Sequence, residues 1–338
     1  MQSVEACEMA PPLPPNSQNA LVYDEEFHVL LREPTLLRIP VEHGHFNLHL
    51  EAPCGNGSFG TVFEGTDDAN RRLAIKFPTL ARREMRTLRT MSENNESTGC
   101  AIIELLLGVD LNGISLIVMP FCPHNLANYE LHTGSSWNKA ELEKIFYDLL
   151  AAVHFLHVND VCHNDIKKQN VLVDEEGRPR VADFGSSSDR SDKYPVSTRA
   201  YRPPENVMKI GYGSRADIWS LGALFFSLLT GDKLVPIVEY VEWGLEAQRA
   251  HMSVLLARTA TPYNRSFAAS NRNEGLFDLP LEKSDLCPIT DVPLRIPGTE
   301  KLKRIVVKML EFHPADRIAL PDAMRIDSAF SSIPLELR

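Results

Sequence analysis

Cysteine is scarce in this sequence, and its six residues are far apart. None of them forms a CxxC pair of the kind that structural zinc sites use. They are also too few and too scattered for a dense disulfide framework. The pattern instead indicates a protein of a reducing compartment, the cytoplasm or the nucleus. The cysteines are Cys7, Cys54, Cys100, Cys122, Cys162 and Cys287.

Long hydrophobic runs are also absent. The most apolar segment, residues 218–229 (IWSLGALFFSLL), is too short to cross a bilayer, and we expect a buried core helix there. Residues 1–20 have Glu5 and Glu8 where a secretory signal would carry basic residues, and they contain no apolar stretch. Their prolines predict a disordered lead-in. We expect no transmembrane segment in the chain.

A surplus of basic residues is the third feature that the sequence lacks. Its 45 acidic residues outnumber the 35 basic ones, which gives a formal net charge of −10. Affinity for a nucleic-acid backbone depends on Lys and Arg, so this balance argues against a general nucleic-acid binder. The 338 residues, 43% of them hydrophobic, suffice for one large domain or two modest ones. We expect a monomer.

The pattern of apolar residues changes along the chain. Residues 21–120 favour short strands separated by turns, and one segment within them, 80–91 (LARREMRTLRTM), has apolar residues at helical spacing. Beyond Asn138 the apolar residues follow longer helical periods. The sequence therefore predicts an α+β protein with a strand-rich small lobe at 21–120 and a helix-rich large lobe at 121–338.

Three histidines in one predicted strand raise the question of a metal site. His43, His45 and His49 lie at even spacing and would share one face, opposite Phe46 and Leu48. No carboxylate or cysteine completes the set at close spacing in the sequence. The solvent face of a half-buried strand is the simpler interpretation, and a metal site is the lesser alternative.

Residues 55–62 (GNGSFGTV) follow the pattern GxGxxGxV. Without side chains, the backbone can fold tightly over a polyphosphate and offer its amide donors. The stretch continues into a strand rather than a helix, which counts against a dinucleotide-binding fold, and a plain glycine-rich hairpin is an alternative. Lys76 follows in the apolar strand LAIK, where its cation needs a phosphate or a carboxylate to offset desolvation.

Two further segments supply groups for a phosphoryl transfer. Residues 163–170 (HNDIKKQN) contain Asp165 as an acceptor for a hydroxyl proton, with Lys167 beside it. Asn170 offers a neutral oxygen ligand for a metal ion, and a short strand further on ends at Asp183 in the triplet DFG. Asn170 and Asp183 form a credible Mg²⁺ pair, because this hard cation takes few protein oxygens and keeps some of its water.

With these motifs in this order, the chain resembles the eukaryotic protein kinases over about residues 46–330. The resemblance implies a bilobal protein kinase fold, with a small antiparallel-sheet N-lobe that contains one helix and a larger, mainly helical C-lobe. The segments STRAYRPPE and LLARTATP are most like those of cyclin-dependent and mitogen-activated kinases. The motifs are the glycine loop, LAIK at Lys76, HNDIKKQN, DFG at Asp183, PPE at Glu205, DIWSLG at Asp217 and HPADR ending at Arg317.

The resemblance implies an active, ATP- and Mg²⁺-dependent kinase that acts on Ser or Thr of protein substrates, and it leaves room for a regulatory protein partner. Glu205 and Arg317 would form a buried ion pair that is structural. The implied catalytic residues are Asp165, Lys167, Lys76 and Thr198, and the implied metal ligands are Asn170 and Asp183. The implied ATP-binding residues are Gly55, Asn56, Gly57, Ser58, Phe59, Gly60, Val62, Ala74, Lys76, Glu84, Met119, Phe121, Cys122 and Leu172.

Two departures from the family pattern stand out. Glu84, the expected partner of Lys76, follows it by only eight positions, so the connection before its helix must be short; an exposed helix charge is the alternative. Asn164 stands where many kinases have an arginine that binds a phosphate on the activation segment, here residues 186–202. Lys193 stands where mitogen-activated kinases have an activating threonine. We therefore expect that phosphorylation of this segment is not required; a neutral substitution at Asn164 is the alternative.

The end of the activation segment also predicts a substrate preference, Ser or Thr followed by Pro. The resemblance implies that Arg202 engages a carbonyl near Ser197, which leaves no acceptor for the amide of the residue after the phosphorylated one. Any other residue at that position would therefore bury an unpaired N–H, which costs free energy. Proline has no N–H and avoids this cost. Two features count against this preference. Ala200 stands where the resembling kinases commonly have an aromatic residue, and the side chain of Ser197 is small.

Two other functions are alternatives. A pseudokinase could bind nucleotide or a partner as a scaffold, but the presence of Lys76, Asp165, Asn170 and Asp183 argues against it. A small-molecule kinase of similar fold is disfavoured by the PPE and DIWSLG motifs of the large lobe.

Overall fold

The computed structural model describes residues 21–22, 30–31, 35–41, 44–57, 60–78, 81–95, 98–111, 114–189, 197–211, 213–236, 243–261, 272–278, 280–326 and 329–333. These residues form two compact units. The first takes the described residues up to Pro123 together with Asp183–Gly185, and the second takes the others. The division after Pro123 lies three residues beyond the expected one, and the DFG triplet belongs with the first unit. The expected lead-in at 1–20 lies outside the described residues.

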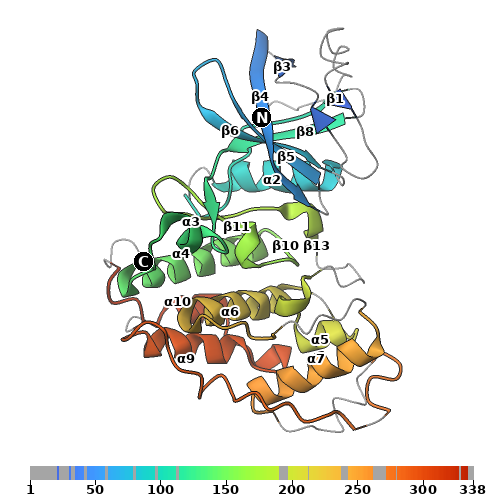
Figure 1. Ribbon diagram of the computed structural model, residues 1–338, viewed down its shortest axis with the longest axis vertical. Coiled ribbons are helices and arrows are strands. Elements are labelled where there is room, and N and C mark those ends of the chain that lie inside the picture. Colours follow the sequence, from blue (N-terminus) through green and yellow to red (C-terminus); the bar gives the residue numbers. More distant parts are fainter. Residues whose placement is uncertain are drawn as a thin grey trace. The chain divides into compact units, whose positions relative to one another are not determined.

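A six-stranded antiparallel sheet is the main element of the first unit (Figure 1). The strand order is β3-β4-β5-β6-β8-β7, and a separate antiparallel pair is formed by β1 and β2. Alternating apolar residues such as Leu37, Leu48 and Phe63 are buried together on the sheet. The strands are β1 (Leu21–Val22), β2 (Leu30–Leu31), β3 (Thr35–Val41), β4 (Gly44–Gly57), β5 (Gly60–Thr66), β6 (Arg72–Pro78), β7 (Leu107–Leu111) and β8 (Ile114–Pro120).

The helix expected within 80–91 is present as α2 (Ala81–Asn95). It packs against β6 and β8, with Leu88 and Met91 fully buried. Only residues 79–80 separate β6 from α2, so the connection is short, as the spacing of Lys76 and Glu84 requires. Within the first unit, one helix on an antiparallel sheet agrees with the expected small lobe.

The histidines of β4 lie on its exposed face. His45 and His49 are exposed, whereas Leu48 and Leu50 on the opposite face are buried; His43 lies outside the described residues. Nε2 of His49 is 3.7 Å from a carboxylate oxygen of Asp68. The described part of the chain contains no group of three or more His, Cys, Asp or Glu side chains that could hold a metal ion. The solvent-facing interpretation therefore fits His45 and His49.

The second unit is mainly helical, and its long helices α4 and α6 form the core. Asn138 caps α4: its side chain accepts a hydrogen bond from N of Glu141 at 3.1 Å, and its own N donates to Glu141 Oε2 at 2.9 Å. Phe146 of α4 and Phe225 of α6 stack with ring centres 3.7 Å apart. The helices are α3 (Tyr129–Thr133), α4 (Lys139–Val158), α5 (Pro204–Val207), α6 (Ser214–Thr230), α7 (Leu245–Arg258), α9 (Glu300–Met309) and α10 (Leu320–Met324).

Helix α6 lies between α4 and α9 (Figure 1) and is buried over most of its length, as expected for residues 218–229. Gly222 permits the close approach of α9, because a Cβ atom there would lie 3.0 Å from Cβ of Met309. None of the helices in the described ranges is both long and apolar enough to cross a membrane. The shorter elements are β9 (His124–Asn125), β10 (Val161–Cys162), β11 (Val171–Val173), β12 (Pro179–Val181), β13 (Ser188–Asp189), η1 (Lys168–Asn170), η2 (Phe184–Ser186), η3 (Arg199–Tyr201) and η4 (Pro314–Asp316).

A bidentate ion pair joins distant parts of the second unit. Arg317 donates from Nη1 and Nη2 to the two carboxylate oxygens of Glu205, at 2.6 and 2.7 Å. Both side chains are buried, and the guanidinium also lies 4.9 Å from the ring centre of Trp219. The expected structural ion pair is thus confirmed, and so is the α+β fold class.

Candidate active site

Lys76 binds two carboxylates within the first unit. It lies in β6 opposite Val62 of β5, and its side chain is almost fully buried. Nζ donates to Glu84 Oε1 at 2.6 Å and to Asp183 Oδ1 at 2.8 Å. Burial acts to lower the pKa of Lys76, but the two carboxylates outweigh it and raise that pKa above its ordinary value. Lys76 is therefore a fixed ammonium ion between two acidic side chains.

The ion pair between Lys76 and Glu84 shows how the short connection is accommodated. Glu84 lies in the first turn of α2, and only 1% of its surface is exposed. Because a buried carboxylate needs a partner, the exposed-charge alternative for Glu84 does not hold. Asp183 reaches the same ammonium group with a backbone φ of 63°, a left-handed conformation that few residues with side chains adopt.

The glycine hairpin joins β4 to β5. Gly60 has a φ of 128°, and a Cβ atom at this position would lie 2.2 Å from the carbonyl oxygen of Phe77. Only glycine fits, so the tight entry into β5 depends on this residue. Gly57 pairs with Gly60 across the hairpin. Gly55, Asn56 and Gly57 belong to β4, and Gly60 and Val62 to β5, whereas Ser58 and Phe59 lie outside the described residues.

The remaining residues of the first unit that are expected to bind ATP lie on and after the central strands. Ala74 of β6 pairs with Met119 of β8. Phe121 follows β8, and its N donates to the carbonyl oxygen of Arg72 at 3.3 Å, so this amide is engaged within the protein. The Arg72 guanidinium also covers the ring of Phe121 at 4.1 Å. Cys122 follows Phe121 in the same unit.

Asp165 is held by four hydrogen bonds in the second unit. Its Oδ1 accepts from N of Thr198 at 2.9 Å and from the Thr198 hydroxyl at 2.7 Å. Its Oδ2 accepts from Nζ of Lys167 at 2.6 Å and from Nδ2 of Asn170 at 3.2 Å. Lys167 Nζ lies also 3.1 Å from the Thr198 hydroxyl. The structure thus brings together four of the expected site residues and fixes the orientation of the carboxylate.

A second carboxylate, Asp217 of α6, supports the backbone just before Asp165. It accepts from N of His163 and N of Asn164, each at 2.8 Å, and it is 1% exposed. The His163 ring lies with Nε2 3.0 Å from the carbonyl oxygen of Ala182 and Nδ1 3.3 Å from N of Asp165. A carbonyl only accepts, so Nε2 carries the proton and Nδ1 accepts. Asp217 thus holds the backbone of His163 and Asn164 in place.

The side-chain amide of Asn170 is fixed by Asp165 in the second unit. Its Nδ2 donates to the backbone and to the side chain of Asp165, at 2.9 and 3.2 Å. With the nitrogen engaged, Oδ1 is the atom that can bind a hard cation. Leu172 follows in β11, which pairs with β9 and β12.

Asn164 contacts the start of the activation segment. Its Nδ2 donates to the Ser188 hydroxyl at 2.8 Å and to the carbonyl oxygen of Ser186 at 3.1 Å. Beside it, β10 pairs with β13, and Cys162 lies opposite Ser188. Lys193 and residues 190–196 as a whole lie outside the described residues.

Arg202 lies at the other end of the activation segment. It donates from Nη2 and Nε to the carbonyl oxygen of Ser197, at 2.6 and 3.2 Å. The contact implied by the family resemblance is present. Sequence reasoning missed Trp243 and His251, which lie against Arg202, because they belong to no motif and follow it by about forty or more positions.

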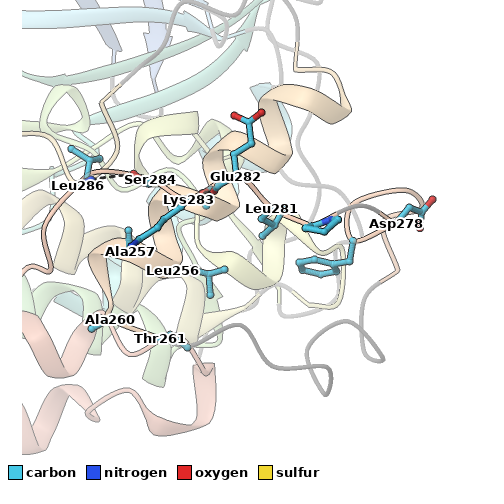
Figure 2. A pocket seen from close by; sticks show the side chains of 13 residues that line it. Leu256, Ala257, Ala260, Thr261, Asp278, Leu281, Glu282, Lys283, Ser284 and Leu286 are labelled. Atoms are coloured by element: carbon cyan, nitrogen blue, oxygen red, sulfur yellow. Dashed lines mark hydrogen bonds between the residues drawn. The ribbon is translucent and has the colours of Figure 1, made fainter.

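A separate cavity of about 880 Å³ opens beside α7 (Figure 2). Its apolar lining includes Leu256, Phe277, Leu281 and Leu286, and Lys283 lies along it with its side chain directed towards Ala257. None of the residues expected to bind ATP, Mg²⁺ or the acceptor lines this cavity. It is therefore no part of the candidate active site.

Residues 48–327 match the protein kinase domain family, and the chain belongs to that family. A probable cell division protein kinase of Encephalitozoon cuniculi is 31% identical over 204 residues, which cover 55% of this chain and 73% of that protein. Human cyclin-dependent kinase 15 is 27% identical over 293 residues, which cover 84% and 66% of the two chains. Cyclin-dependent kinase C-1 of Oryza sativa subsp. japonica is 28% identical over 211 residues, which cover 54% and 41%.

The chain therefore spans between 41% and 73% of the length of these relatives. Family and relatives together identify it as a serine/threonine protein kinase of the cyclin-dependent-like group. The family expected from the motifs is confirmed.

Proposed function

We propose that the protein transfers the γ-phosphate of ATP to Ser or Thr of protein substrates, that it prefers a proline after the acceptor, and that its activation segment needs no phosphorylation. The observation that carries the transfer is the fixed carboxylate of Asp165, which is 3% exposed and accepts hydrogen bonds from Thr198, Lys167 and Asn170. A pseudokinase scaffold would have no need for this arrangement.

Each residue has a role that follows from its contacts. Asp165 orients the acceptor hydroxyl and takes its proton. Lys167, next to that carboxylate, steadies the transferring phosphate, and Thr198 ties the carboxylate to the substrate-binding end of the activation segment. Lys76, kept charged by Glu84, holds the α- and β-phosphates.

Each of the two residues that the sequence assigns to Mg²⁺ offers an oxygen of the kind that this cation binds. Asn170 presents Oδ1 and Asp183 a carboxylate, and hard cations bind such oxygens. When bound, Mg²⁺ would neutralise charge on the phosphate oxygens and help to align them. Asn170 and Asp183 are the residues that we propose as its ligands.

The neutral contacts of Asn164 support independence from phosphorylation. A kinase that needs a phosphate on its activation segment needs a cation to bind it. Here the amide of Asn164 bonds directly to Ser186 and Ser188, so this end of the segment is held without added charge.

The contact between Arg202 and Ser197 supports a preference for proline. With its carbonyl oxygen engaged by the guanidinium, Ser197 offers no acceptor to the backbone N–H of a substrate. An unpaired N–H costs about 1–3 kcal/mol, which corresponds to about ten- to a hundredfold in kcat/KM at the lower to middle part of that range. Proline avoids this cost.

The setting of the reaction is also a proposal. The five described cysteines are free thiols, which suits a reducing compartment such as the cytoplasm or the nucleus. Relatives named as cyclin-dependent kinases favour a regulatory protein partner.

The decisive experiment is transfer of radiolabelled phosphate from ATP to a generic protein substrate, followed by an unbiased peptide array. We expect labelled phosphoserine and phosphothreonine with wild type and none with Asp165→Asn. A wild-type protein that binds ATP but transfers nothing would support the scaffold alternative instead.

A further inference from the structure

Two aromatic side chains outside the kinase motifs surround Arg202. The indole of Trp243, just before α7, has its ring centre 4.7 Å from the guanidinium carbon of Arg202 and 5.4 Å from that of Arg199. His251 of α7 lies nearly perpendicular to the indole, with ring centres 5.3 Å apart. Position 200, where the related kinases commonly have an aromatic, holds only Ala200, so Trp243 supplies an aromatic contact from another part of the chain.

The indole stabilises a buried cation. Arg202 is 8% exposed, and it donates from Nη2 and Nε to the carbonyl oxygen of Ser197. The electron-rich face of an indole attracts a guanidinium, and the attraction is stronger when the cation is desolvated. Trp243 therefore favours a guanidinium position in which Arg202 also engages the carbonyl of Ser197.

His251 holds the backbone of the same residue. Its Nε2 lies 3.2 Å from the carbonyl oxygen of Arg202 and therefore donates to it. Burial lowers the pKa of His251 to about 4, and the nearby Arg202 cation also disfavours protonation. At neutral pH the ring is uncharged and adds no repulsion to Arg202.

We propose that Trp243 is a positioning residue for substrate selection: it holds Arg202 on the carbonyl of Ser197 and so excludes substrates without a proline after the acceptor. The inference rests on the proposed function, because it concerns the same discrimination. Without the indole, Arg202 leaves Ser197 more often, and the freed oxygen can accept the backbone N–H of another residue. The preference for Pro then falls, because kcat/KM rises for substrates that lack Pro after the acceptor.

The test compares kcat/KM for two peptides that differ only in Pro or Ala after the acceptor. Wild type should prefer Pro by about ten- to a hundredfold. We expect Trp243→Leu to reduce this ratio to about threefold or less, chiefly by a gain with the Ala peptide, and Trp243→Phe to give an intermediate ratio. Trp137→Leu is the matched control, because that buried indole stacks on Tyr129 at 4.0 Å; its ratio should stay at the wild-type value.

Two outcomes would overturn the inference: an unchanged ratio in both Trp243 variants, or equal losses with both peptides, which would indicate a general structural role. If Trp243→Leu does not fold, Trp243→Phe decides. A wild-type ratio near one would instead refute the proline preference itself, and with it the role of Trp243. As an internal check, Trp243→Leu should cause no further change in ratio in an Arg202→Ala background.

Discussion

Asn164 donates a hydrogen bond from Nδ2 to the hydroxyl oxygen of Ser188, and the two atoms are 2.8 Å apart. The backbone of Asn164 has a φ of 64°, a left-handed conformation that asparagine tolerates better than most residues. Its N is anchored on Asp217 at 2.8 Å. A neutral side chain thus links the loop that carries Asp165 to the residues that follow DFG.

This link predicts that the activation segment works without a phosphate. The protein is made in a host without other kinases and then treated with phosphatase. It should keep most of its activity, because position 164 has no cationic side chain that would need to bind a phosphate. Activity is compared before and after treatment, with mass spectrometry to show that phosphate is gone. A large drop that phosphorylation of Tyr194 or a nearby Ser restores would reveal a different switch.

The amide of Asn164 can be separated from its backbone conformation. Asn164→Gly tolerates the left-handed φ but loses the amide, and each lost hydrogen bond contributes about 0.5–1.5 kcal/mol. We expect kcat to fall about two- to tenfold in Asn164→Gly, and less in Ser188→Ala, which retains the contact to Ser186. If both variants matched wild type, Asn164 would be a neutral substitution, which is the alternative that the sequence left open.

The two charged groups proposed for catalysis give a sharper expectation. Lys76→Met removes the cation that positions the phosphates, and Asp165→Asn removes the proton acceptor. Each should lower kcat/KM by more than about a hundredfold while the protein remains folded. Circular dichroism and melting curves provide the check on folding. Retained activity in Asp165→Asn would refute its assignment.

Substitutions of two other aspartates should have different effects, one on activity and one on stability. Asp183→Asn should abolish the Mg²⁺-dependent rate, measured across a Mg²⁺ titration, with a small change in melting temperature. Asp217→Asn should chiefly destabilise the second unit, by about 1–3 kcal/mol, because it leaves a buried backbone N–H of His163 or Asn164 without its acceptor. Identical melting temperatures for wild type and Asp217→Asn would contradict this division.

The sequence predicted those parts of the site that local motifs carry. Lys76, Asp165 and Asn170 could be found because strand pattern and motif fix their places, and Glu84 could be found despite its short spacing because a helix must begin nearby. The contact of Asn164 with Ser188 could not be predicted, because it depends on β10 and β13. Each of these strands has only two residues and no signal in the sequence. The stacking of Trp243 on Arg202 is likewise a tertiary contact between segments that no periodicity connects.

His251 gives a prediction about stability and pH. Its pKa is about 4 in the folded protein because the ring is buried, against an ordinary value of 6.5. Below about pH 6.5 the unfolded chain therefore binds a proton at His251. The folded protein binds a proton there only below about pH 4. The free energy of unfolding must then fall as the pH is lowered through this window and is unaffected above it.

The size of the effect follows from the shift in pKa. Each unit corresponds to 1.36 kcal/mol, so His251 accounts for at most roughly 3 kcal/mol between neutral pH and pH 4. His251→Gln keeps a neutral donor for the carbonyl of Arg202 but does not titrate, and it shares every other titrating group with wild type. Urea unfolding at pH 7.5, 5.5 and 4.5 should show wild type losing more stability than His251→Gln on acidification. Parallel pH profiles for the two proteins would mean that the ring of His251 reaches solvent and is protonated as easily as in the unfolded chain.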